Sequence, residues 1–255
     1  MRVVAVIQAR MGSSRVSGKV LREILGKPML WHLVSRVQEV EYIDDVVIAT
    51  TDSRNDDSLE AFAHNFRLGI YRGSENDIVD RILNAGKKYS ADAIVRIWGD
   101  CPLIDPALID KVLAEFTEGN YDYANNTNPR TYPAGMDFEV YTLVSLEKIW
   151  NETNDSYYRQ YPFEYVYDYQ DSFRALYDKS DVDLSDIHLT VDYPKDFELV
   201  TEIYKHLYDS QQVFHLEDIV RLLEANPDLK TKNKGLARNI EYYRSKKLRE
   251  GKDNG

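Results

Sequence analysis

Cysteine is almost absent from this 255-residue chain, which contains one thiol, Cys101. One thiol cannot form an internal disulfide, and no CxxC pair or His/Cys cluster has the spacing of a structural zinc site. Long apolar runs are missing too: residues 3–7 are too short for the apolar core of a signal peptide, and no stretch has the length needed to span a bilayer. We therefore expect a protein of the reducing cytoplasm, with no membrane partner.

Positive charge is scarce, because 32 Lys and Arg face 43 Asp and Glu for a net charge of −11. General nucleic-acid binding would need a broad basic face, so this balance argues against it and suits an enzyme that acts on small molecules. The length allows one large α/β domain, alone or with an inserted lobe. The histidines lack the spacing of a metal site or catalytic triad and are expected to be structural or surface groups: His32, His64, His188, His206 and His215.

The start of the chain stands out against this acidic background. Residues 3–7 predict a short buried strand, and the loop after it holds two glycines, three hydroxyls and the cations Arg10, Arg15 and Lys19. Open α/β sheets bind ligands beyond the carboxyl ends of their strands, so we expect this loop to hold a polyanion such as a nucleoside triphosphate. It is not a Walker A loop, because five residues separate its glycines and Val20 follows the lysine. The alternative is a connection whose cations are simply solvated.

Apolar strands alternate with helical patterns through the first half of the chain. Short connections between them predict an α/β fold with a doubly wound, mostly parallel sheet. The carboxyl ends of four successive strands carry Arg10, Asp52, Ser74 and Asp100, which we expect at one rim of the sheet. The predicted strands cover residues 3–7, 45–50, 69–72 and 92–98, and the predicted helices cover residues 29–37, 55–66, 77–89 and 106–116.

The middle of the chain changes character. Residues 121–185 are rich in Asn and Tyr, and we expect an inserted flap or dimerisation subdomain that covers the rim of the sheet. Its tyrosines could equally fill core and interface positions without touching a substrate. Within it, alternation predicts a strand over residues 137–141, and helical spacing predicts helices over 143–150 and 157–167.

The last third returns to the first pattern and then turns basic. Residues 187–191 predict a final buried strand, and helices are expected over 195–208 and 215–225. We expect a single domain over residues 1–228 and a basic C-terminal helix or tail over 229–255. A solvated terminal helix is the simpler interpretation of the tail, and a partner-binding arm is the alternative.

Two aspartates follow apolar strands in turns that proline stiffens: Asp100 precedes Pro102, and Asp192 precedes Pro194. Mg²⁺ takes oxygen ligands and shares them between one or two carboxylates, phosphate and water. We therefore predict a Mg²⁺ site at Asp100 and Asp192. Either aspartate could instead cap the helix that follows it.

A competing metal motif is the DxD pair Asp181 and Asp183, of the kind that holds a metal ion in glycosyltransferases that use nucleotide sugars. It lies in a polar run with no apolar strand before it. A nucleotide-sugar-dependent glycosyltransferase of polysaccharide biosynthesis is therefore the alternative enzyme. A nucleotide sensor without catalytic activity is a third hypothesis.

Seven segments carry a family resemblance: residues 7–19 (IQARMGSSRVSGK), 26–30 (GKPML), 49–52 (ATTD), 72–75 (RGSE), 99–104 (GDCPLI), 132–140 (YPAGMDFEV) and 190–194 (TVDYP). Together they resemble the CMP-sugar synthetase group of cytidylyltransferases, which includes the 3-deoxy-manno-octulosonate and acylneuraminate cytidylyltransferases. They look most like the relatives called spore coat polysaccharide biosynthesis protein F.

This resemblance implies a Rossmann-like, GT-A-like nucleotidyltransferase that binds CTP and Mg²⁺ and forms a homodimer. It implies catalytic roles for Arg10, Lys19 and Asp100, and Mg²⁺ ligation by Asp100 and Asp192. The family reaction moves CMP onto an oxygen of a sugar acid or phosphorylated small molecule and releases pyrophosphate. The nucleotide contacts that it implies are Ala9, Arg10, Gly12, Ser13, Arg15, Lys19, Thr51, Asp52, Gly73 and Ser74.

The acceptor is not inherited from the family. Asp137 and Glu139 project to one face of their predicted strand, where they could bind hydroxyls or an amine of the acceptor or could simply be solvated. After this strand, relatives more usually carry an acidic-basic-His run, whereas residues 157–164 read YYRQYPFE. The identity of the acceptor stays open at this point.

Overall fold

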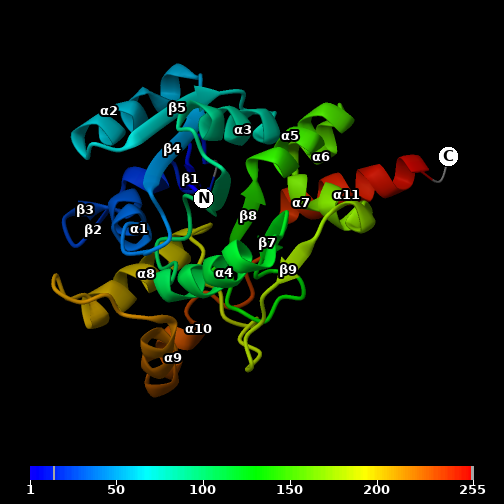
Figure 1. Ribbon diagram of the computed structural model, residues 1–255. Coiled ribbons are helices and arrows are strands. Elements are labelled where there is room, and N and C mark those ends of the chain that lie inside the picture. The colour runs from blue at the N-terminus through cyan, green and yellow to red at the C-terminus, as the bar shows by residue number, and fades with distance from the viewer. Residues whose placement is uncertain (14, 254–255) are drawn as a thin grey trace.

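The computed structural model describes residues 1–13 and 15–253, so Ser14 of the opening loop and residues 254–255 of the predicted tail lie outside the described residues. A seven-stranded sheet in the order β5-β4-β1-β6-β8-β7-β9 forms its centre (Figure 1). β8 runs against its neighbours and the other six strands share one direction, so the predicted mostly parallel sheet is confirmed. The strands are β1 (Val3–Gln8), β4 (Asp45–Thr51), β5 (Gly69–Gly73), β6 (Ala93–Trp98), β7 (Tyr123–Asn125), β8 (Phe138–Thr142) and β9 (Ala175–Tyr177), and a small separate hairpin joins β2 (Glu23–Ile24) to β3 (Lys27–Pro28).

β1 lies at the centre and contributes to two hydrophobic cores, because successive side chains of a strand point to opposite faces of the sheet. Ala5 and Ile7 join the larger core, and Val4 and Val6 join the other. All four are fully buried. Burial of one such valine or isoleucine side chain contributes about 1.5–3 kcal/mol, which explains why the opening run forms a central strand.

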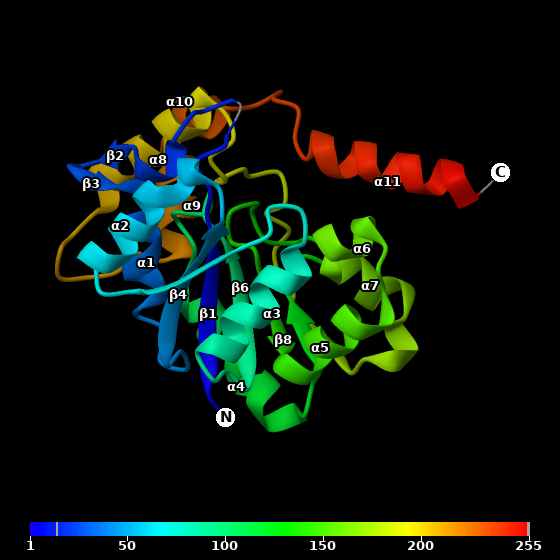
Figure 2. The ribbon, with the colours of Figure 1, turned by 90° about the horizontal axis from the view of Figure 1, so that it is seen from above.

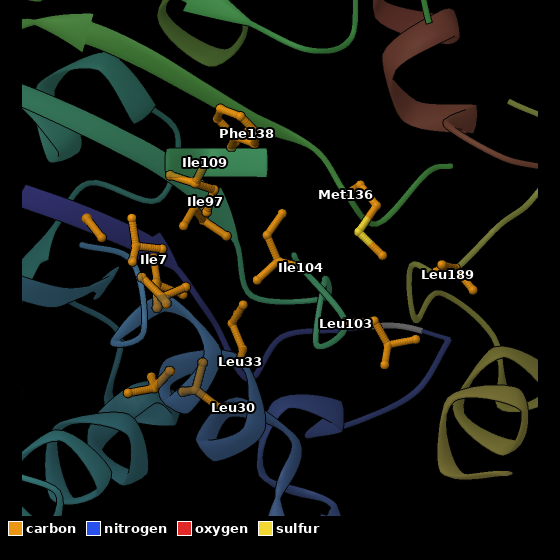
Figure 3. Packing of buried hydrophobic residues seen from close by; sticks show 14 of the residues in the cluster. Ile7, Leu30, Leu33, Ile97, Leu103, Ile104, Ile109, Met136, Phe138 and Leu189 are labelled. Atoms are coloured by element: carbon orange, nitrogen blue, oxygen red, sulfur yellow. The ribbon is translucent and has the colours of Figure 1, made fainter. Parts of the chain in front are cut away.

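Helices cover both faces of the sheet (Figure 2). Figure 3 shows the larger core, where Leu30 and Leu33 lie beneath Ile7, and Ile109 lies beside Ile97. Among the described residues, no helix has both the length and the apolar content that crossing a bilayer requires. The larger core receives α1 (Met29–Val37), α2 (Asp57–Asn65), α4 (Pro106–Gly119), α8 (Pro194–Leu207) and α9 (Leu216–Ala225), and the second core receives α3 (Ile78–Lys88), α5 (Leu143–Glu152), α6 (Ser156–Gln160) and α7 (Pro162–Asp168).

The strand predicted over residues 187–191 is wrong. Its apolar side chains are buried, but its backbone forms an isolated bridge between Ala134 and His188 and a single bond from Val191 to Asp100 instead of a ladder with a strand. Gly135 makes this approach possible, because its φ is +106° and a Cβ there would lie 2.7 Å from the carbonyl carbon of Leu189. The sheet is extended instead by β7 and β9 of the Asn- and Tyr-rich segment. The apolar alternation correctly predicted which side chains of this segment are buried, but it did not predict whether its backbone pairs with a strand.

The predicted insert, residues 121–185, and the C-terminal segment lie side by side. The single helix predicted over 157–167 is two helices, α6 and α7, because Pro162 has no N–H to continue the first one. After α10 (Pro227–Thr231), the chain ends in α11 (Ile240–Asp253), which projects from the body next to α6 and α7 (Figures 1 and 2). The Tyr242 and Tyr161 rings are 5.3 Å apart, and Arg249 pairs with Asp168 at 2.9 Å. Within the basic segment, α11 is therefore a helix docked against α6 and α7.

Candidate active site

The carboxyl end of β6 packs directly against the carboxyl end of β1. Gly99 donates its N–H to the carbonyl of Gln8 at 2.8 Å, and a Cβ on Gly99 would lie 2.8 Å from the same oxygen. A larger residue could not approach so closely, because contacts of this length are repulsive for carbon. The next residue, Asp100, is thereby held beside the loop that follows β1.

Lys19 joins the two aspartates that the sequence predicted as a pair. Its Nζ lies 2.9 Å from Asp100 Oδ2 and 3.7 Å from Asp192 Oδ1, and it donates to the carbonyl of Val191 at 2.6 Å. The Val191 N–H in turn donates to the Asp100 carbonyl at 2.9 Å. Gly18, with φ of +60°, turns the loop so that Lys19 points inward, a backbone conformation that glycine adopts at little cost. Three side chains from three distant segments therefore converge.

The charge of Lys19 is secured by its neighbours. Burial by itself lowers the pKa of this ammonium, but the negative charges of Asp100 and Asp192 and the hydrogen bond to Asp100 outweigh burial and raise the pKa overall. The Lys19 side chain is only 11% exposed, so its charge acts with little screening by water. The site therefore holds a fixed cation between two carboxylates.

Two arginines of the same loop, Arg10 and Arg15, precede Lys19 in the sequence. Arg15 is 3.4 Å from Asp192, and its guanidinium lies 4.9 Å from the centre of the Tyr193 ring. Arg10 pairs with Glu75, which follows the carboxyl end of β5, and both side chains are about half exposed. Pairs this exposed contribute little to stability, so both arginines can exchange their carboxylate partners for an anionic ligand.

The other predicted residues of this region are Ala9, which ends the approach from β1, and Gly12 and Ser13, which lie between Arg10 and Arg15. Ala9 is buried and donates its N–H to the end of β4, whereas Gly12 is exposed, with space around the position of a Cβ. Ser13 donates its N–H to the Met11 carbonyl at 2.8 Å, and its Oγ accepts the Val16 N–H at 3.4 Å. These bonds close the loop on itself and hold its cations toward the rim.

Four of the predicted nucleotide contacts lie at the neighbouring strand ends: Thr51, Asp52, Gly73 and Ser74. Thr51 of β4 pairs with Gly73 of β5, and the Asp52 N–H donates to the Gly73 carbonyl at 3.1 Å. The Ser74 carbonyl accepts from Arg81 at 2.7 Å, so the turn after β5 is anchored on α3. The Arg10–Glu75 pair then links this turn to the loop after β1. The predicted nucleotide residues thus form one continuous rim over β5, β4 and β1.

The chemistry of Asp100 and Asp192 fits a magnesium ion. Their carboxylates reach the same ammonium, so they face one point from two sides. Among residues 1–13 and 15–253, no group of three or more His, Cys, Asp or Glu side chains is arranged to hold a metal ion. Two carboxylates suffice for Mg²⁺ when substrate phosphate and water supply its other ligands.

The two predicted acceptor residues are both paired within the protein. Asp137 accepts two hydrogen bonds from the Arg130 guanidinium, at 2.7 and 2.9 Å. Glu139 is 1% exposed, pairs with Arg96 at 2.8 Å and accepts the Tyr141 hydroxyl at 2.8 Å. A role for either in acceptor binding stays a prediction.

Sequence analysis missed Asp56, a buried carboxylate that ties the opening loop to β4. It accepts the N–H of Met11 at 2.7 Å, the N–H of Thr51 at 3.3 Å and the Thr51 hydroxyl. Burial by itself raises the pKa of Asp56, but these hydrogen bonds outweigh it and lower the pKa. Its place in the first turn of the helix predicted over residues 55–66 indicated one of the acidic residues that are common there, so the pattern carried no signal of this bridge.

The competing DxD pair lies on the surface. Val182, between its two aspartates, is 62% exposed. Asp183 accepts the N–H of Ser185 at 3.0 Å, so its carboxylate closes its own turn. Asp181 and Asp183 do not belong to the cluster of ion pairs around Lys19.

Comparison with known proteins adds an independent finding. A family model described as Cytidylyltransferase matches residues 4–247. The spore coat polysaccharide biosynthesis protein SpsF of Bacillus subtilis is 31% identical, over 90% of this chain and 97% of its own. A solved cytidylyltransferase from Leptospira borgpetersenii superimposes with a TM-score of 0.87 at 31% identity, over 93% of this chain and 100% of its own. A CMP:2-keto-3-deoxy-manno-octonic acid synthetase solved in complex with CTP has the same fold, with a TM-score of 0.62 at 20% identity, over 81% of this chain and 99% of its own.

Proposed function

The chain belongs to the cytidylyltransferase family, and we propose that it transfers CMP from CTP to an oxygen of a small acidic acceptor, with Mg²⁺ bound and pyrophosphate released. The resemblance inferred from the sequence is thereby confirmed, and with it the class of enzyme, a nucleotidyltransferase. The observation that carries the proposal is the meeting of Lys19 with Asp100 and Asp192 at the end of the loop after β1. A sugar acid or a phosphorylated metabolite is the proposed class of acceptor.

Nucleotidyl transfer requires alignment and positive charge more than covalent participation by the protein. The acceptor oxygen would attack the α-phosphorus in line, and the bond from that phosphorus to the β-phosphate bridging oxygen would break. Lys19, Arg10 and Arg15 would neutralise the charge that pyrophosphate gains as it leaves. Mg²⁺ on Asp100 and Asp192 would supply Lewis-acid polarisation of the phosphate oxygens.

The acceptor needs no protein base if its attacking oxygen belongs to a carboxylate or a phosphate, since these groups are already ionised at neutral pH. Arg130 and Arg96 are the cations next to the predicted acceptor residues Asp137 and Glu139. Arg130 keeps about a third of its side chain exposed, whereas Arg96 is buried. Of these two ion pairs, the one of Arg130 and Asp137 is therefore better placed to meet an acidic acceptor.

A screen of pyrophosphate release tests the proposal. CTP, UTP, ATP and GTP would each be incubated with Mg²⁺ and a panel of sugar acids and phosphorylated metabolites. We expect pyrophosphate with CTP and at least one acceptor, and a CMP adduct of that acceptor by mass spectrometry. Transfer of a sugar from a nucleotide sugar without pyrophosphate would favour the glycosyltransferase, and tight CTP binding with no turnover would favour a sensor.

Three finer features stay predictions: the cytoplasmic location, the homodimer and the choice of Mg²⁺ among divalent ions. The dimer prediction is the simplest to check, because one chain has a mass of 29.6 kDa. Light scattering at micromolar concentration should give about twice that mass.

A further inference from the structure

The turn that carries Asp192 is held from beneath by a buried carboxylate, Asp196. Its Oδ2 accepts the backbone N–H of Asp192 at 3.0 Å and the N–H of Tyr193 at 2.8 Å. Asp196 is fully buried, in the first turn of α8. The orientation of Asp192 therefore depends on where the Asp196 carboxylate is fixed.

The C-terminal segment fixes the Asp196 carboxylate in place. Arg238 donates to both oxygens of Asp196, each at 2.7 Å, and Asn233 donates its side-chain amide to Oδ1 at 2.7 Å. A bidentate guanidinium bond is stronger and more directional than a bond between neutral groups. Burial by itself raises the pKa of Asp196, but the bonds from Arg238, Asn233 and the turn outweigh it and lower the pKa, so the carboxylate stays charged.

The same segment also contacts the turn directly. The Tyr193 hydroxyl donates to the carbonyl of Ala237 at 2.9 Å, and the Arg238 guanidinium lies 5.6 Å from the Tyr193 ring centre and 3.8 Å from Asp192 Oδ2. In Figure 2, the chain that follows α10 runs at the same end of the molecule as the loop after β1, in dark blue. Within residues 233–238, Arg238 therefore lies near Asp192 Oδ2, whereas Lys19 lies near the other oxygen, Oδ1.

We propose that residues 233–238 belong to the metal site, with Arg238 as a positioning residue that acts on Asp192 through Asp196. Arg238 and Asn233 hold the Asp196 carboxylate in one orientation, and that carboxylate holds the Asp192 turn so that its side chain faces Asp100. This inference rests on the proposed function, since it assigns a task to the turn that the proposal gives to Mg²⁺. Groups that hold metal ligands in place typically affect metal affinity or activity by about 10- to 100-fold.

The test compares Arg238→Ala, Arg238→Lys and Arg249→Ala with the wild type. Arg249 is the matched control, because it lies in α11 and pairs with Asp168 and Tyr158 of the insert. Binding of Mn²⁺, followed by electron paramagnetic resonance in the presence of a non-hydrolysable CTP analogue, reads the site without turnover. Circular dichroism and thermal unfolding establish that each variant is folded.

We expect Arg238→Ala to weaken Mn²⁺ binding about 10-fold or more, and Arg238→Lys to give a smaller loss because lysine keeps the charge without the bidentate bond. Arg249→Ala should bind Mn²⁺ as the wild type does. Wild-type Mn²⁺ affinity in folded Arg238→Ala would overturn the inference. If Arg238→Ala does not fold, Asn233→Ala and Arg238→Lys decide: weaker Mn²⁺ binding supports the inference, and unchanged binding overturns it.

The two proposals can fail separately. A wild-type protein that binds Mn²⁺ but releases no pyrophosphate from CTP with any acceptor would refute the proposed function and leave the positioning role measurable. A wild-type protein that releases pyrophosphate, with a Mg²⁺ dependence that Arg238→Ala leaves unchanged, would refute the positioning role alone.

Discussion

The rim of the sheet and its interior use charged side chains differently. At the carboxyl ends of β5, β4, β1 and β6, each ion pair keeps a partner in contact with water: the side chains of Arg10 and Glu75 are 49% and 50% exposed, and that of Asp100, which pairs with Lys19, is 28% exposed. Between β6 and β8, in the interior of the sheet, the side chains of Arg96 and Glu139 are each 2% exposed. Exposed partners can be exchanged for a ligand, whereas a buried pair leaves an uncompensated charge when one partner is removed. The rim therefore presents charge, whereas the pair of Arg96 and Glu139 holds β8 against β6 in the interior of the sheet.

Removal of Glu139 should sharpen this contrast most. In Glu139→Ala, Arg96 loses its buried counter-ion, so we expect the free energy of unfolding to fall by about 3–5 kcal/mol. Urea denaturation measures it, and Glu147→Ala, which breaks an exposed pair with Lys87, should cost at most about 1 kcal/mol. An unchanged unfolding midpoint together with a raised KM for the acceptor alone would break the contrast and make Glu139 an acceptor residue.

Asp100→Ala should lower activity and leave stability nearly unchanged, the opposite of what we expect for Glu139→Ala. We expect kcat to fall about 10²-fold or more, as for the loss of one preorganised electrostatic group, with stability nearly unchanged because Lys19 keeps Asp192 and the Val191 carbonyl. Asp181→Ala is the matched control, since it alters the exposed DxD pair. Activity lost in Asp181→Ala but kept in Asp100→Ala would favour the glycosyltransferase.

Lys19→Ala should weaken the binding of CTP, which has a triphosphate, more than the binding of CMP. Loss of a charged hydrogen-bond donor costs about 1.5–3 kcal/mol, so CTP should bind roughly 10- to 100-fold more weakly. CMP lacks the two outer phosphates and should lose less than about 3-fold on the same reasoning. Calorimetry of both nucleotides provides the comparison, and equal losses would remove Lys19 from the triphosphate site.

Asp56→Asn tests the link between the opening loop and β4, and the expected effect is the smallest. An amide keeps one acceptor oxygen, so loss of the other should cost about 1–3 kcal/mol of stability. The pKa of Asp56 is lowered in the folded state from an ordinary value of 3.8, so its stabilisation is complete above that value and disappears as the pH falls through the folded-state pKa. The stability difference between the wild type and Asp56→Asn should therefore shrink below pH 4, and a constant difference down to pH 2 would contradict this assignment.

Local pattern was sufficient for the parallel half. β1 is apolar up to Gln8 and β6 is apolar except for Arg96, because both faces of a parallel sheet are buried, and polar residues follow the end of each strand. Since parallel strands present their carboxyl ends at one edge, Arg10, Lys19 and Asp100 could be grouped from sequence alone. The pairing of Asp100 with Asp192 followed from two similar turns.

Only the tertiary structure decided the rest, because it depends on contacts between segments far apart in the chain. Residues 187–191 have the pattern of a strand, but whether a buried segment joins a sheet depends on a partner strand that the pattern does not specify. From the sequence, Glu139 could be solvated or could face the acceptor, whereas the structure pairs it with the buried Arg96. In the sequence, Arg238 is one of several cations in a basic tail. In the structure, it binds Asp196, 42 residues earlier, and this bond connects the tail to the Asp192 turn. Hydrophobic period and strand ends are local properties, whereas the partner of a buried charge is set by the packed chain.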